Sequence, residues 1–100
     1  MVQGVENLTR LRGRVVSRAP DPRRAGWDVV VVHVEDAGPV AGRADLLSGR
    51  VGDDLPVVFR RDLLGGARPG ARVTFRARVV PDGAIAEPYP DEGDLLVEPA

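Results

Sequence analysis

Residues 71–80 alternate between apolar and polar side chains, and this alternation limits the fold more than any other stretch of the chain. A period of two residues places successive side chains on opposite faces of a β-strand, whereas an α-helix needs a period of about 3.6. One face then carries Val73, Phe75, Ala77 and Val79, and the other carries Arg72, Thr74, Arg76 and Arg78. The pattern predicts a strand with one face in a core and the other in water.

Other short runs rich in β-branched residues, separated by glycine and proline, predict further strands. They cover residues 8–18, 27–35 and 55–59, with shorter candidates at 84–86 and at 94–98, the latter as a fifth strand. Gly13 favours a bulge or a sharp coil in the first of these, and the valine run at 29–32 indicates burial on both faces or a central place in the sheet. Leu46 and Leu47 fit an edge strand or a single helical turn equally well. No segment sustains the apolar spacing of a long helix.

Length and composition narrow the class of protein. One hundred residues suit one domain, 1–100, in which the acidic segment 81–100 has room for a closing strand. The chain has no cysteine, no apolar run long enough for a membrane span, and an N-terminal stretch unlike a signal peptide, so we expect a cytoplasmic protein. All fourteen basic side chains are arginine.

The segment Val57–Val80, VVFRRDLLGGARPGARVTFRARVV, carries a resemblance to a known family. With Asp62-Leu63 after one strand and Pro69-Gly70 before the next, it resembles the barrel segment of minichromosome-maintenance helicases and related single-strand-binding proteins, which is an OB-fold (oligonucleotide/oligosaccharide-binding) domain. Ala71 replaces the acidic residue usual after the glycine, and the zinc-binding cysteines and the ATPase of those helicases are missing. The resemblance implies an OB-like barrel, and it does not imply a helicase.

Together, the strand order and the resemblance predict an all-β fold. We expect a small five-stranded OB-like Greek-key barrel with a short helical turn between strands 3 and 4. Other small barrels and β-sandwiches remain alternatives. In the Pro69-Gly70 turn, proline fixes its own φ and glycine permits a positive φ, so the chain can reverse tightly into the next strand.

Charge is distributed unevenly along the chain, although the net charge is only −1. Residues 1–80 hold fourteen arginines and nine acidic residues, a net charge of +5, while residues 81–100 hold six acidic residues and no basic one. If the first and fourth strands pair, one outer face collects arginines that phosphates could neutralise. These arginines are Arg10, Arg12, Arg14, Arg72, Arg76 and Arg78.

The arginine face leads to a functional hypothesis. We expect a module that binds nucleic acid, DNA or RNA, single-stranded and with low sequence specificity, in which Trp27 stacks on a base. Two other readings stay open. The arginines can be a solvated surface neutralised by the acidic segment, or the chain can be an accessory module that docks on a protein partner through an exposed strand or through residues 87–98.

Residues that could carry catalysis are few. His33 lies in the valine run, where a structural role is expected, and neither Ser17 nor Ser48 belongs to a GxSxG motif. The sequence GGARPG lacks the lysine and hydroxyl of a phosphate-binding P-loop. We therefore expect no enzyme activity, no cofactor and no metal.

Overall fold

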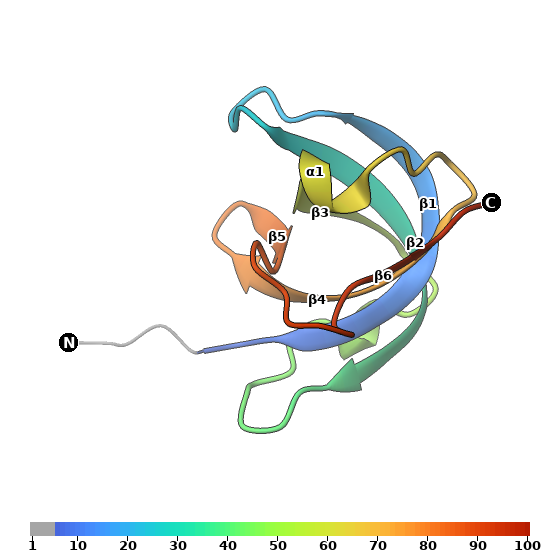
Figure 1. Ribbon diagram of the computed structural model, residues 1–100. Helices are drawn as coiled ribbons and strands as arrows, with labels where there is room; N and C mark the ends of the chain where they lie inside the picture. Colours follow the sequence, from blue (N-terminus) through green and yellow to red (C-terminus); the bar gives the residue numbers. More distant parts are fainter. Residues whose placement is uncertain (1–5) are drawn as a thin grey trace.

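The computed structural model describes residues 6–100 and consists mainly of β-strands (Figure 1). The strands are β1 (Thr9–Pro20), β2 (Trp27–Pro39), β3 (Asp54–Arg60), β4 (Arg72–Val80), β5 (Gly83–Ala86) and β6 (Leu96–Glu98). A 3-10 turn, η1 (Ser48–Arg50), precedes β3, and a short helix, α1 (Arg61–Leu64), follows it. Neither of these helical segments is long enough or apolar enough to cross a membrane.

Five strands close into a barrel. Antiparallel pairs join β1 to β2, β2 to β3 and β4 to β5, while β3 and β5 run parallel. The circle closes because β1 also pairs antiparallel with β4. The predicted all-β class and the closed five-stranded barrel are confirmed, and the barrel is compatible with an OB-like fold. The short helix α1 is the helical turn expected between strands 3 and 4.

Strand β1 holds the barrel closed because it pairs on both of its edges. It pairs with β2 along nearly its whole length, and Thr9–Arg14 also pair with β4. The pairing register with β2 shifts between Arg12 and Gly13, and Gly13 is buried there. A Cβ added to Gly13 would lie 2.2 Å from the His33 carbonyl oxygen and 2.7 Å from Val32 Cγ1. The bulge expected at Gly13 therefore forms, and only glycine fits the close approach of the two backbones.

The core lies inside the barrel and is formed by the alternate side chains of each strand that point inward. In β2 the alternate residues Val30, Val32 and Val34 are completely buried, whereas Val29 and Val31 face outward and are only half-buried. The valine run thus marks a central strand, with one face fully buried rather than two. The Phe59 and Phe75 rings meet edge to face at 4.8 Å between centroids, as the parity of β3 and β4 predicts. The core position predicted for Val79 is wrong: its side chain is 37% exposed, because it lies beyond Ala77, where the pairing of β4 with β1 ends.

A buried carboxylate holds together the end of the barrel next to α1. Asp28 points inward, with its side chain 6% exposed. It accepts hydrogen bonds from Arg18 Nε at 2.7 Å and from Arg61 Nε at 2.8 Å. Arg18 also donates to the carbonyl oxygens of Gly65 and Ala67, so this one network ties β1, β2, α1 and the following turn to each other.

The C-terminal segment differs from the sequence prediction. The fifth barrel strand is β5, not residues 94–98, because the short β5 is enough to bridge β3 and β4. Leu96–Glu98 form a sixth strand, β6, which pairs with Arg72–Thr74 on the edge of β4 that β1 does not use. Leu95 packs against the core.

The two turn predictions also have outcomes. Leu46 and Leu47 lie in neither a strand nor a helical turn, because the 3-10 turn η1 begins one residue later, at Ser48. Leu47 is buried immediately before η1, while Leu46 is exposed. Gly70 has a φ of 96°, as expected for the Pro69-Gly70 reversal.

Gly13→Ala should destabilise the barrel strongly. The new methyl group would overlap the β2 backbone, so the two strands must separate, at a cost of about 2 kcal/mol or more. Urea unfolding measures the change. Gly38→Ala is the matched control, because Gly38 lies in β2 with no atom within 4 Å of its added Cβ. Equal midpoints for the two variants would contradict the argument.

Asp28→Asn should remove about 3 kcal/mol of stability, because it leaves two guanidinium groups without their buried partner. Burial raises the pKa of Asp28, but the hydrogen bonds from Arg18 and Arg61 outweigh burial and hold that pKa below its ordinary value. A lowered pKa stabilises the folded state above about pH 4, and this contribution is lost as the pH falls further. Unfolding free energy measured from pH 7 to pH 3 should therefore fall less in D28N than in the wild type. A parallel decline in both proteins would refute the assignment.

Candidate functional site

The predicted arginine face forms on β1 and on the first part of β4. In the antiparallel pairing of β1 with β4, Arg10 lies opposite Arg76 and Arg14 lies opposite Arg72. Their neighbours in both strands, Leu11 and Phe75 among them, point into the core. The guanidinium groups therefore extend outward from the barrel surface. We call this group the arginine wall, and it consists of Arg10, Arg12, Arg14, Arg72 and Arg76.

Carboxylates already neutralise part of the arginine wall. Arg76 binds Glu87 through two hydrogen bonds of 2.6 and 2.7 Å, which raise the pKa of Arg76, and its Nη2 lies 3.4 Å from Asp94. Arg14 and Arg72 share Glu35 more loosely, at 3.9 and 3.7 Å. Within residues 6–100, no ion pair involves Arg10, Arg12 or Arg78.

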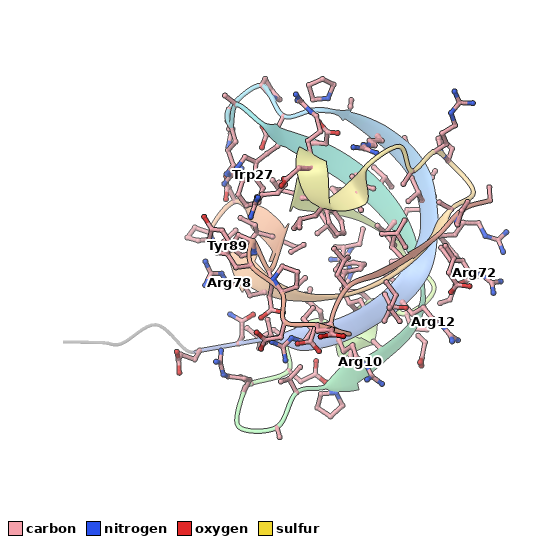
Figure 2. The ribbon with its side chains drawn as sticks, viewed as in Figure 1. Arg10, Arg12, Trp27, Arg72, Arg78 and Tyr89 are labelled. Atoms are coloured by element: carbon pink, nitrogen blue, oxygen red, sulfur yellow. The ribbon has the colours of Figure 1, made fainter. Side chains whose placement is uncertain are left out.

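The predicted site residues fall into two separate groups (Figure 2). Arg10, Arg12 and Arg72 lie toward one side of the barrel, and Trp27 and Arg78 lie toward another. Arg78 lies outside the arginine wall because the pairing of β1 with β4 ends at Ala77. Its partner in the neighbouring strand is Ile85 of β5. The structure thus does not bring Trp27 together with the arginines of β1.

Trp27 instead lies near Arg60 of β3 and Tyr89, on the outer face of the barrel. It is half-buried on the outer face, directly opposite Arg60. The Arg60 guanidinium carbon lies 4.9 Å from the centre of the Tyr89 ring, and its Nη1 donates to the Pro88 carbonyl oxygen at 2.6 Å. Tyr89 is 81% exposed. Arg60 also pairs with Asp62 at 2.6 Å. The same surface therefore carries Trp27 opposite Arg60 and the Tyr89 ring against the Arg60 guanidinium group.

An apolar row lies beside these rings. The register aligns Val29 of β2, Val58 of β3 and Ile85 of β5, all half-buried and facing outward. Arg78 of β4 continues the row. Arg78 also lines a hollow of about 210 Å³ with Arg43 and Tyr89. We call the surface formed by Trp27, Arg60, Tyr89, the apolar row and Arg78 the aromatic face.

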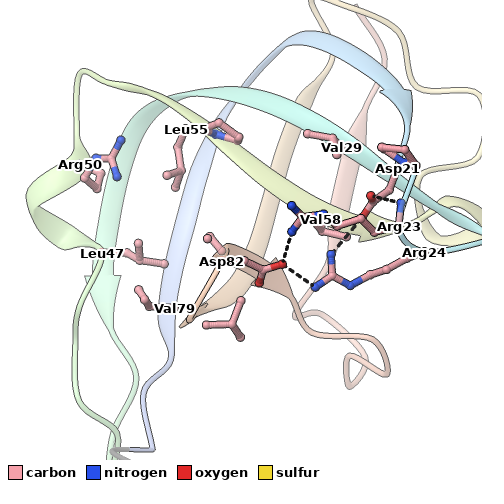
Figure 3. A pocket seen from close by; sticks show the side chains of 15 residues that line it. Asp21, Arg23, Arg24, Val29, Leu47, Arg50, Leu55, Val58, Val79 and Asp82 are labelled. Atoms are coloured by element: carbon pink, nitrogen blue, oxygen red, sulfur yellow. Dashed lines mark hydrogen bonds and ion pairs between the residues drawn. The ribbon is translucent and has the colours of Figure 1, made fainter.

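A larger cavity of about 680 Å³ adjoins the aromatic face (Figure 3). It lies between the β1–β2 loop (residues 21–26), β3 and the turn between β4 and β5, and its apolar lining includes Val29 and Val58 of the row. Arg23 and Arg24 of the loop both contact Asp82 of the turn, at 3.1 and 3.3 Å. Five charged residues also line the cavity: Asp21, Arg23, Arg24, Arg50 and Asp82. A volume of several hundred cubic ångströms that combines apolar lining with polar groups is typical of a ligand site.

The one histidine of the chain pairs with a single carboxylate. His33 is exposed on the outer face of β2, where its Nδ1 lies 2.7 Å from Asp54 and no third titratable group joins the pair in the described part of the chain. No cluster in residues 6–100 has the three or more ligating side chains that a metal site needs.

Of the residues in this region, Trp27 and Arg78 are among those predicted from the sequence, whereas Arg23, Arg24, Arg60 and Tyr89 are not. Arg23 and Arg24 form a basic pair inside a loop marked by proline and glycine, which is a usable signal because loops often carry binding residues. Tyr89 is flanked by two prolines, which favours exposure of its ring. Nothing in the sequence places either of these features beside β3.

Comparison with protein-family models, with curated proteins and with solved structures gives no match for this chain. Its function must therefore be argued from its own residues.

Proposed function

We propose that the protein binds single-stranded nucleic acid with low sequence specificity, mainly across its aromatic face. The observation that carries the proposal is the presence on one surface of the exposed Tyr89 ring, the half-buried Trp27 ring, an apolar row and Arg78, which no ion pair engages within residues 6–100. Arg60 of the same face pairs with Asp62 at 2.6 Å. Base stacking on aromatic rings and electrostatic contact with the backbone together characterise non-specific single-strand binding. The closed barrel is compatible with an OB-like fold, in which the outer face of the second and third strands commonly binds oligonucleotides.

Single strands suit this face better than a duplex. The side chains of the apolar row have no charge to offer a phosphate, so they favour contact with the flat faces of unpaired bases. Arg78 and Arg43, which no ion pair engages within residues 6–100, lie beside Tyr89 and can meet the phosphates that follow a stacked base. Arg10 and Arg12 of the arginine wall offer further phosphate contacts for a longer strand.

A protein partner as the main ligand has less support. Glu87 and Asp94, two of the carboxylates through which the acidic segment would dock, already neutralise Arg76. Leu95 and Val97 pack against the core, so the segment stabilises the barrel. We therefore propose nucleic acid, not a protein, as the main ligand, and we propose binding without catalysis.

Tyr89→Ala should weaken binding to a fluorescein-labelled oligo(dT) about tenfold, because one base loses its stacking surface. Fluorescence anisotropy at low salt measures the dissociation constant, and quenching of Trp27, the only tryptophan, provides a second signal. Leu96→Ala is the control, since Leu96 is also exposed but lies beside Thr74 near the arginine wall. No binding by the wild type at low salt, or equal losses in the two variants, would refute the proposal.

Arg78→Gln should reduce the dependence of affinity on salt. A single-strand contact to one phosphate contributes about 0.7 to the slope of log K against log salt concentration, so the slope should become shallower by about that amount. Arg68→Gln removes the same charge from the turn before β4, where Arg68 lines a different hollow beside Val97 and Ala100. Its slope should stay close to that of the wild type. Identical slopes for R78Q and R68Q would exclude Arg78 from the interface.

A further inference from the structure

Two loops that are far apart in sequence meet at a single carboxylate beside the 680 Å³ cavity (Figure 3). The Oδ2 atom of Asp82 accepts hydrogen bonds from Arg23 Nη1 at 3.1 Å and from Arg24 Nη2 at 3.3 Å. Arg23 and Arg24 come from the β1–β2 loop, and Asp82 comes from the turn between β4 and β5. One anionic oxygen thus lies between two guanidinium groups at the edge of the proposed binding face.

The position of Arg24 does not depend on Asp82 alone. Asp21, whose side chain is only 4% exposed, accepts a hydrogen bond from Arg24 Nη1 at 3.0 Å. Asp21 is itself held by the Arg23 backbone N–H at 2.9 Å, and its own backbone N–H donates to the Trp27 carbonyl oxygen. These contacts hold the pKa of Asp21 below its ordinary value, and Asp21 in turn raises that of Arg24. The loop therefore keeps a guanidinium group directed at this point whether or not Asp82 occupies it.

Asp82 is the replaceable partner of the three. Its side chain is 40% exposed, and that of Arg23 is 73% exposed. Ion pairs that water can reach contribute little to stability, so a competing anion can displace the carboxylate at small cost. The turn that carries Asp82 has only two residues between β4 and β5, so Asp82 stays close to the site after its displacement.

The net charge of the Arg23, Arg24 and Asp21 cluster matches that of a phosphodiester. Without Asp82, Arg23, Arg24 and the buried Asp21 carry a net charge of +1, which a phosphodiester neutralises with its single negative charge. Its two free oxygens can each accept a hydrogen bond from one guanidinium group, whereas the carboxylate presents one oxygen to both. The adjoining apolar lining, Val29 and Val58, leads directly to Trp27 and Arg60 on the same faces of β2 and β3.

We infer that Arg23 and Arg24 form the subsite for one backbone phosphate of a bound strand, and that the Asp82 carboxylate occupies this subsite until the phosphate replaces it. The inference rests on the proposed function. It extends that function by naming the two arginines that bind one phosphate and the carboxylate that competes with it. Asp82 then weakens the binding of a strand that uses this subsite, because the phosphate must displace the carboxylate.

Asp82→Asn tests the subsite directly. The variant should bind oligo(dT) of about ten nucleotides, a length within the usual range for one OB barrel, more tightly than the wild type, by about threefold to tenfold at low salt. Asp36→Asn is the charge-matched control, since Asp36 is exposed near the other end of β2 and lines a hollow with Arg10 and Arg12. The control measures how much of the gain comes from the change in net charge alone.

Arg24→Gln completes the cycle. In the double variant with Asp82→Asn, the gain in oligo(dT) affinity should disappear, because the subsite then lacks the guanidinium group that Asp21 holds in place. Equal gains in D82N and D36N, or a gain in D82N that survives Arg24→Gln, would overturn the subsite while leaving the proposed function in place. If neither the wild type nor D82N binds at low salt, the proposed function fails, and the subsite fails with it.

Discussion

The pairing of β1 with β4 is the contact on which the rest of the molecule depends. It converts a row of strands into a closed barrel, and it requires β1 to coil tightly enough to pair on both of its edges. Gly13 allows this coil, because the β2 backbone occupies the space that a Cβ would need. Closure removes exposed strand edges and gives the valines of β2 and the two phenylalanines a common interior.

Closure also divides the outer surface into two faces with different chemistry. The arginine wall lies on β1 and β4, where Glu87 and Asp94 from the C-terminal segment balance Arg76. The aromatic face lies on β2, β3 and β5, where apolar side chains that would be unusual on a simple solvated surface line up across three strands. The proposed binding role follows from this second face, which combines stacking surface and positive charge.

Two aspartates with the same kind of partners have opposite expected roles because their burial differs. Asp28 and Asp82 each accept hydrogen bonds from two arginines. The Asp28 carboxylate is almost inaccessible, so it acts as a structural joint whose loss leaves buried charge without compensation. The Asp82 carboxylate is in contact with water, so exchange for another anion is inexpensive. Solvent access, more than the identity of the pair, separates a structural contact from a replaceable one.

The sequence alone determined the strand class, the inward and outward parity of β4 from Arg72 to Ala77, the bulge at Gly13 and the reversal at Gly70, because these depend on local backbone geometry and on a period of two residues. It also indicated that β1 and β4 carry outward arginines. Tertiary structure alone decided which carboxylates neutralise them, that β5 rather than residues 94–98 completes the barrel, and that Arg23 and Arg24 meet Asp82. Those outcomes depend on contacts between residues far apart in the chain, and the spacing of side chains along a single strand carries no information about them.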